Sequence, residues 1–265
     1  MREAAQRFTG FADEYDRARP HPPADLPDLL CAWAGLAPGE RVPTVVDLGA
    51  GTGISTVPWA GRADRVVALE PSPDMRDVAA QRCAAAGMTV DLRDGTAEDT
   101  GMPNHCADVV TAGQALHWFD PERALPEIAR ILRPGGVFAA YDCDWPPCVD
   151  AEVDQAYREF ERLYRDEETR RGIRPPAAAK DGHAGRMRDS GLFRHVAEMA
   201  LSRRDEGDAG RLLAVALSQG GLVALLAQGV DERAIGLAGL RETAARRLPE
   251  PRSWWWTYRV RLAVA

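Results

Sequence analysis

The fold is decided by a strand that runs into a glycine-rich turn, VVDLGAGTG at residues 45–53. Valine and leucine around Asp47 predict a buried strand, and the glycines that follow let the backbone turn sharply into a helix. Glycines also let a ligand approach the backbone without meeting a Cβ atom. The spacing is G-x-G-x-G. A dinucleotide-binding turn, G-x-G-x-x-G, would need its third glycine at the position of Ile54. The stretch predicts a ligand-binding turn at the edge of a sheet.

Outward from this turn, short β-branched runs alternate with helical stretches, which is typical of a parallel sheet covered by helices. We expect strands at 43–48, 65–70, 88–92, 107–112 and 137–141, with helices directly after the glycine turn and at 73–86 and 121–132. Beyond Tyr141 the alternation stops. There we expect helices at 150–170, at 182–190 and within 208–248, and strands at 193–201 and 254–265.

Two of the later helical segments have more than one interpretation. Val153, Tyr157, Phe160 and Tyr164 fall on one stripe of the 150–170 helix, which predicts either core packing or a wall of a substrate pocket. We carry Tyr157 forward as a candidate substrate contact. Residues 212–230 contain no charge, but glycines and glutamines within them favour buried helices broken at 220–221 over a membrane span.

Glu70 ends the second expected strand, at the same sheet edge as the glycine turn. An acidic side chain in that place can accept hydrogen bonds from both hydroxyls of a ribose. The same feature suits the ribose of NAD, so a nicotinamide-dependent oxidoreductase stays open as an alternative.

Composition narrows the possible partners. The chain has 265 residues, of which 45% are hydrophobic, so it can bury a substantial core. Its formal charge of −7, without a basic block, argues against a nucleic-acid partner. The first residues contain no apolar signal core, which predicts a cytoplasmic protein. Five cysteines form no C-x-x-C pair, and no further cysteine or histidine clusters in sequence with Cys143 and Cys148, so we expect reduced thiols and no metal. Lys180 is the only lysine, which we interpret as the compositional bias of a GC-rich genome.

The chain resembles class I S-adenosylmethionine-dependent methyltransferases in four ordered segments. Residues 45–53 resemble their first motif and residues 66–75 their second. Residues 95–99 resemble the segment that brackets the adenine, and residues 131–136 resemble the signature that precedes the fifth strand. The resemblance runs from about residue 8 to 141 and resumes weakly near 180–203 and 253–265.

The resemblance implies cofactor contacts position by position. Asp47, Gly49 and Gly51 would lie against the methionine part of S-adenosylmethionine, with Ala50 and Gly53 beside them. Glu70 would accept from the ribose, and Met75, with Pro71 nearby, would pack on the adenine. Thr96, Ala97 and Glu98 would bound the other side of the adenine. Members of the family often have aspartate where Thr96 stands, and a hydroxyl is a weaker partner for the adenine amine.

Two further segments resemble methyltransferases that act on trans-aconitate and other small acids. Residues 114–119, QALHWF, resemble their A-x-H-W-F segment, which follows the fourth strand. Phe8, Tyr15 and Arg19 resemble their lid helix, whose tyrosine and arginine reach toward the methionine end of the cofactor. By this resemblance Tyr15, Arg19 and Gln114 contact the cofactor, and Trp118 contacts the acceptor; core packing of Trp118 and a surface position for Arg19 are the alternatives.

His117 is the candidate catalytic residue. It follows the segment closest to the reacting carbon, and as a base it could take a proton from a hydroxyl or amine. With a carboxylate acceptor no base is needed, and His117 would only orient the substrate. A hydrogen-bonded structural histidine is the alternative.

Together these features predict one Rossmann-like α/β domain with a seven-stranded, mostly parallel sheet. We expect an N-terminal lid with helices over 1–42, a core of 43–143, 179–204 and 253–265, and helical cap insertions at 144–178 and 205–252. The expected function is S-adenosylmethionine-dependent methylation of a small molecule at oxygen, nitrogen or carbon, in secondary-metabolite biosynthesis, with S-adenosylhomocysteine as product. A non-catalytic S-adenosylmethionine-binding protein is the other alternative. The sequence predicts that no membrane is a partner, and it does not indicate an oligomeric state.

Overall fold

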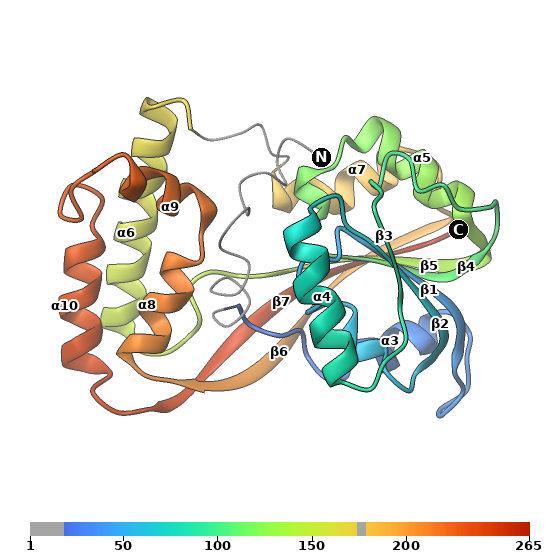
Figure 1. The fold of residues 1–265 in the computed structure, drawn as a ribbon, viewed down its shortest axis with the longest axis horizontal. Helices are drawn as coiled ribbons and strands as arrows, with labels where there is room; N and C mark the ends of the chain where they lie inside the picture. The colour runs from blue at the N-terminus through green and yellow to red at the C-terminus, as the bar shows by residue number, and fades with distance from the viewer. Residues whose placement is uncertain (1–18, 174–178) are drawn as a thin grey trace.

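The computed structural model describes residues 19–173 and 179–265 and contains a seven-stranded sheet (Figure 1). In spatial order the strands are β3 (Asp91–Arg93), β2 (Ala63–Leu69), β1 (Val42–Leu48), β4 (Ala107–Gly113), β5 (Leu132–Cys143), β7 (Arg252–Val264) and β6 (His195–Gly207). The first five pair in parallel, and β7 is antiparallel to both of its neighbours. The prediction of a seven-stranded, mostly parallel Rossmann-like sheet is confirmed.

The central strands are apolar on both sides because helices cover both faces of the sheet. In β1, Val45 belongs to one hydrophobic cluster and the adjacent Val46 to the other, so successive side chains point to opposite faces. Helices α5 (Pro121–Ile131) and α7 (His183–Asp189) cover one face, and α3 (Leu26–Trp33) lies against the other (Figure 1).

Helix α4 (Pro73–Ala85) begins and ends where its sequence signals place it. The Ser72 side chain accepts a hydrogen bond from the Met75 backbone N–H, and Pro73 occupies the first turn. Gly87 adopts a positive φ of 64° just beyond the last turn, the conformation that ends helices most often.

The α-helix expected directly after the glycine turn was wrong. The chain instead makes consecutive turns and the short 3₁₀ helix η2 (Val57–Trp59). Pro58 lacks the N–H that an α-helical ladder needs, and Gly61 with φ of 72° ends the segment.

Strand boundaries differ most in the second half of the sheet. The last two strands are longer than predicted and pair over their full length, from His195 with Val264 to Gly207 with Arg252. The extension of β6 was hidden because it contains arginines and acidic residues that alternate at a sheet edge. The third strand, expected at 88–92, is only Asp91–Arg93.

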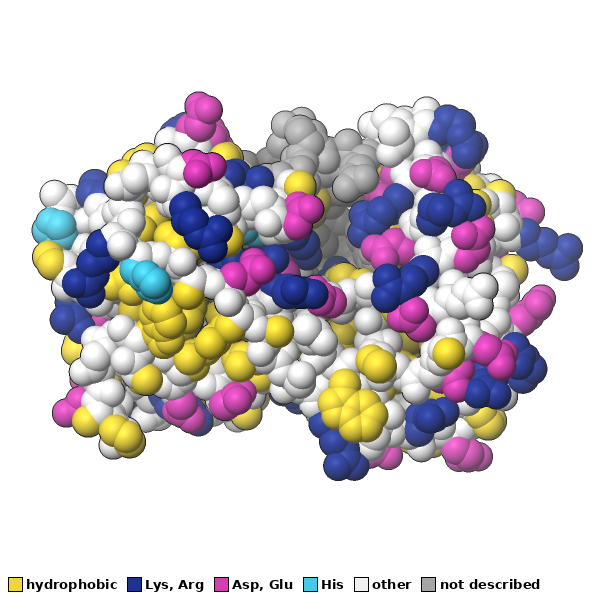
Figure 2. All heavy atoms as spheres, turned by 180° about the vertical axis from the view of Figure 1, so that it is seen from behind, with side chains coloured by type: hydrophobic (Ala, Val, Ile, Leu, Met, Phe, Trp, Pro, Cys, Tyr) yellow, Lys and Arg dark blue, Asp and Glu magenta, His cyan; other side chains and the backbone are white. Residues whose placement is uncertain are grey.

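The outer half of the β6–β7 hairpin carries a cluster of four helices beside the sheet (Figure 1). They are α6 (Ala151–Arg170), α8 (Ala209–Leu217), α9 (Gly220–Ala227) and α10 (Leu237–Arg247), hereafter the helical cap. The stripe of α6 is fully buried inside this cap. Its outer side forms ion pairs one turn apart, such as Arg158 with Asp154, and Figure 2 shows basic and acidic side chains interspersed over this lobe.

No single helix in the described parts of the chain is long and apolar enough to cross a membrane; α8 and α9 pass that test only as a pair bent by 83°. The break between α8 and α9 lies at Ser218 and Gln219, directly before residues 220–221, where it was predicted.

Candidate active site

A cavity opens at the carboxyl ends of β1, β2 and β4. Its volume is about 920 Å³, including solvent at its mouth. The neighbours of β1 are β2 on one side and β4 on the other, so the chain order reverses here, and such a switch point is the usual ligand site of an open α/β sheet. The walls come from the segments that follow these strands and from β5, β7 and the chain before α3. The lining residues that the sequence analysis predicted are Arg19, Gly49, Ala50, Gly51, Glu70, Pro71, Met75, Gln114 and Trp118.

The glycine turn brings its backbone directly to this cavity. Gly49 has φ of 64°, and a Cβ there would lie 2.8 Å from the Ala115 side chain, so no larger residue fits. Gly51 has φ of 56° and a Cβ on it would face open space. The space in front of Gly51 is where a ligand could contact the backbone.

Gly53, a predicted cofactor contact, is not among the residues that line the cavity. A Cβ on Gly53 would lie 3.3 Å from the backbone of Ala79 in α4. This glycine allows the turn to pack against α4, while its neighbours Thr52 and Ile54 line the cavity.

Glu70 reaches into the cavity from the end of β2, although only 6% of its surface is exposed. Its two carboxylate oxygens accept from the backbone N–H groups of Gly51 at 3.0 Å and Ser72 at 2.8 Å. Burial raises the pKa of this carboxyl, and the two backbone donors oppose that rise. A carboxylate can accept about four hydrogen bonds, so the held side chain retains capacity for ligand hydroxyls.

Asp47, predicted to contact the methionine part, lies outside the cavity lining. Its carboxylate is fully buried and accepts from the hydroxyls of Ser55 at 2.8 Å, Thr56 at 2.6 Å and Thr111 at 2.8 Å. Burial raises its pKa, while these hydroxyls counteract the rise. Asp47 therefore joins the glycine turn to β4.

The segment predicted to bound the adenine does not reach the cavity either. Ala97 is fully buried in the core, and Thr96 pairs with Asp99 in a short bridge. Glu98 accepts from the backbone N–H of Asp120, at the start of α5, at 3.0 Å. Residues 96–98 thus connect the end of β3 with the start of α5.

Tyr157, a predicted substrate contact, does not line the cavity. Its ring is fully buried in the helical cap, and its hydroxyl accepts from Gln219 Nε2 at 3.2 Å. The stripe of α6 is core packing because α8, α9 and α10 cover it. Tyr15, a predicted cofactor contact, lies outside the described residues.

Arg19 lines the cavity and joins it to the helical cap. Its guanidinium lies 5.1 Å from the centre of the Trp145 ring and donates to the carbonyl of Ser218 at 3.2 Å. Arg19 is therefore no surface charge.

His117 lies behind the cavity wall, whereas its neighbour Trp118 lines the cavity. The two rings pack with centres 4.8 Å apart. His117 Nδ1 lies 3.5 Å from Oδ1 of Asp142, a side chain that is 4% exposed. Burial lowers the pKa of His117, Asp142 opposes this and the charge of Lys180 adds to it, so the imidazole is neutral at neutral pH.

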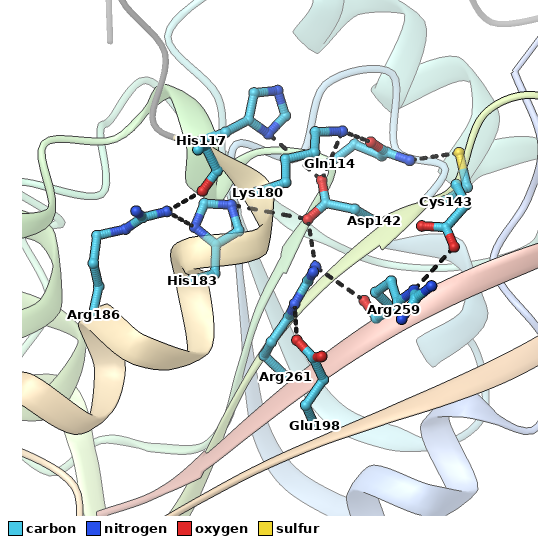
Figure 3. A network of polar contacts seen from close by, with 12 residues as sticks. Gln114, His117, Asp142, Cys143, Lys180, His183, Arg186, Glu198, Arg259 and Arg261 are labelled. Carbon is cyan, nitrogen blue, oxygen red and sulfur yellow. Dashed lines mark hydrogen bonds and ion pairs between the residues drawn. The ribbon is translucent and has the colours of Figure 1, made fainter. Parts of the chain in front are cut away.

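Asp142 is the centre of a polar network, the Asp142 network, that sequence reasoning missed (Figure 3). Lys180 Nζ lies 3.0 Å from Oδ1, and Arg261 Nη1 donates to Oδ2 at 3.1 Å. His183 Nε2 lies 4.0 Å from Oδ2. Burial alone would raise the pKa of Asp142, but His117 and Lys180 outweigh it and hold that pKa below its ordinary range. A signal was present, since Asp142 is an acid at the end of an apolar strand.

The Asp142 network touches the cavity through Gln114. Lys180 Nζ donates to Gln114 Oε1 at 2.8 Å, and Gln114 Nε2 donates to the Cys143 sulfur at 2.7 Å (Figure 3). Gln114 has φ of 55°, a backbone conformation that non-glycine residues rarely adopt. Both ends of its amide are thus held at the cavity wall.

His117, Asp142 and His183 are the kinds of residue that bind a transition metal, and their ligand atoms lie within 4.8 Å of one another. However, an ammonium and a guanidinium already lie 3.0 and 3.1 Å from the carboxylate. A divalent cation would be repelled by both charges, so these residues fit a salt-bridged network better than a metal centre.

Comparisons with known proteins agree with this geometry. Residues 46–140 match a family model described as a methyltransferase domain. An uncharacterized methyltransferase of Mycobacterium tuberculosis is 42% identical over 135 residues, 51% of each chain. A malonyl-[acyl-carrier protein] O-methyltransferase of Serratia marcescens is 34% identical over 134 residues, 50% of this chain and 49% of that one. The chain therefore spans about half the length of the curated relatives it matches.

A solved structure extends the similarity to nearly the whole chain. A candidate type II methyltransferase of Anaeromyxobacter dehalogenans is 26% identical and superposes with a TM-score of 0.64. The match covers 93% of this chain and 97% of that one, so the helical cap and the hairpin belong to the shared fold.

Proposed function

Because the chain carries a class I methyltransferase domain, we propose that it binds S-adenosylmethionine and transfers the methyl group to a small molecule at oxygen, nitrogen or carbon. S-adenosylhomocysteine is then the product. The transfer is an in-line displacement at the sulfonium methyl, and catalysis comes mostly from positioning and exclusion of water.

The observation that carries this proposal is the meeting of Glu70 and the glycine turn in one cavity. Glu70 is held by two backbone N–H groups, and its remaining lone pairs suit the ribose hydroxyls. Gly49 and Gly51 present bare backbone to the methionine part, and Met75 forms an apolar wall for the adenine. Arg19 supplies the positive charge that the carboxylate of the methionine part would pair with.

The acceptor would lie beside Trp118. Trp118, Tyr141 and Tyr258 give this part of the cavity aromatic walls. The relative from Serratia marcescens is named for O-methylation of malonyl-[acyl-carrier protein]. Acceptor choice, however, varies with the segments outside the shared sheet, so that relative's acceptor need not be the acceptor of this chain. We therefore keep a small-molecule acceptor, in secondary-metabolite biosynthesis.

Titration calorimetry with S-adenosylhomocysteine, S-adenosylmethionine and NAD tests the proposal. We expect binding of the first two and none of NAD, which separates the methyltransferase from the oxidoreductase alternative. Glu70→Gln places an NH₂ opposite the Gly51 or Ser72 N–H, so affinity for S-adenosylhomocysteine should weaken by about 1–3 kcal/mol. Glu242→Gln, an exposed site on α10, is the matched control and should bind as wild type does.

Equal affinity in Glu70→Gln and wild type would remove Glu70 from the site. Binding of S-adenosylmethionine without methyl transfer to any acceptor in a broad panel would favour the non-catalytic alternative.

A further inference from the structure

Lys180 stands out because every other basic residue of this chain is an arginine, 33 basic residues in all. Compositional bias explains why arginine was used wherever a cation of either kind serves. It does not explain the exception. The one lysine lies in the Asp142 network, beside the cavity, where its 36% exposed side chain meets a carboxylate that is 4% exposed (Figure 3).

The two cationic side chains differ in shape. An ammonium is a compact point charge, whereas a guanidinium spreads its donors over a rigid plane. Lys180 Nζ satisfies two groups from one point, the Gln114 Oε1 at 2.8 Å and the Asp142 Oδ1 at 3.0 Å. Arginine already contacts the other oxygen of Asp142, through Arg261.

Contact with Lys180 fixes which way the Gln114 amide faces. The ammonium can only donate, so Oε1 must point to Lys180 and Nε2 to Cys143. Gln114 is held in a strained backbone conformation at the cavity wall, the kind of strain that persists where surrounding structure enforces it.

His117 shares Oδ1 of Asp142 with Lys180. The charged and titratable groups around His117 are therefore Asp142 from β5, Lys180 from η4 (Lys180–Gly182), His183 from α7, and Arg19. Lys180 is the member that connects this imidazole environment with the amide on the cavity wall.

We propose that Lys180 is a positioning residue for methyl transfer: by bridging Gln114 and Asp142 it fixes the cavity wall at the acceptor end together with the His117–Asp142 pair. This rests on the proposed function and adds to it. The acceptor class that needs such an arrangement has a hydroxyl or amine, whose proton His117 can accept.

The first test needs no acceptor. In protein loaded with S-adenosylhomocysteine, the ring signals of His117 are followed by NMR against pH and assigned with His117→Gln. Lys180→Met removes a positive charge near the imidazole, so the midpoint of the His117 titration should move to higher pH. Arg188→Met, the same charge change at an exposed site on α7, should leave the midpoint unchanged.

The second test measures turnover with an acceptor found by screening for S-adenosylhomocysteine release. Lys180→Arg and Lys180→Met should both lower kcat roughly 10- to 100-fold, the cost of a small misplacement, with KM for S-adenosylmethionine within about threefold. Reductive dimethylation of wild type keeps the charge of Nζ but removes N–H donors, and should also lower kcat. The same treatment of Lys180→Arg controls for the N-terminal amine.

An unchanged His117 midpoint in Lys180→Met, or full turnover in Lys180→Arg, overturns the proposal. Failure of wild type to bind S-adenosylhomocysteine overturns the proposed function instead. The two failures are therefore distinguishable.

Discussion

Two buried aspartates lie near the carboxyl ends of parallel strands but have opposite electrostatic surroundings. Asp47, in β1, is fully buried and accepts only from neutral hydroxyls, of Ser55, Thr56 and Thr111. Asp142, in β5, meets an ammonium, a guanidinium and an imidazole. Burial raises the pKa of the first, while positive partners hold the pKa of the second below its ordinary range.

The difference separates a structural carboxylate from an electrostatic one. Asp47 organises the turn that a ligand contacts, with partners only a few residues away in the chain apart from Thr111. Asp142 organises charges around His117, and its partners come from η3 (Leu116–Trp118), η4, α7 and β7. Asp47 is thus held by neutral partners that are mostly local in sequence, and the Asp142 network is charged and assembled from distant segments.

The largest expected effect is on turnover, from His117→Gln. With a hydroxyl or amine acceptor, loss of a general base should lower kcat roughly 10²- to 10⁴-fold, because the proton then has no receiver. Affinity for S-adenosylhomocysteine, measured by calorimetry, should stay as in wild type, since Glu70 and the glycine turn are untouched. Glu70→Gln should show the reverse pattern.

Because Trp118 and not His117 lines the cavity, a catalytic His117 must reach the acceptor past the Trp118 ring. An orienting role would raise KM with a smaller loss of kcat. A variant that melts at lower temperature and keeps full turnover in the cold would make His117 a core residue.

The next effect is on stability, from paired asparagine substitutions. Asp142→Asn leaves Lys180 and Arg261 without their buried counter-charge and should cost about 3 kcal/mol of unfolding free energy, lessened because Arg261 keeps Glu198. Asp47→Asn loses no ion pair, and its hydroxyl partners can rotate, so about 1 kcal/mol is expected. Urea denaturation at neutral pH measures both, and equal losses would show that the two sites are electrostatically alike.

The same contrast explains what could be predicted from sequence. The glycine turn and Glu70 could be predicted because a strand, a turn and the end of the next strand carry their roles within residues 45–70. Gly53 and Tyr157 do not line the cavity, since Gly53 packs against Ala79 of α4 and Tyr157 contacts Gln219 before α9, and periodicity alone does not locate these partners. Asp142, Lys180 and Arg261 lie far apart in the chain, and only the pairing of β5 with β7 and the return of the chain through η4 bring them together.

The smallest effect is a pH dependence of stability that comes from His183 in the Asp142 network. Burial lowers the pKa of His183 in α7 to about 4, so between that value and the ordinary pKa of about 6.5 the unfolded chain binds a proton that the folded chain does not. Stability from this residue is complete above the unfolded pKa and is lost as pH falls through this window. Wild type should therefore lose about 1–2 kcal/mol more than His183→Gln between pH 7 and pH 5, by urea denaturation. His195→Gln, an exposed site on β6, is the control and should follow wild type. If His183→Gln and wild type lose the same amount, protonation of His183 does not couple to folding, and the acid sensitivity of the Asp142 network must come from His117.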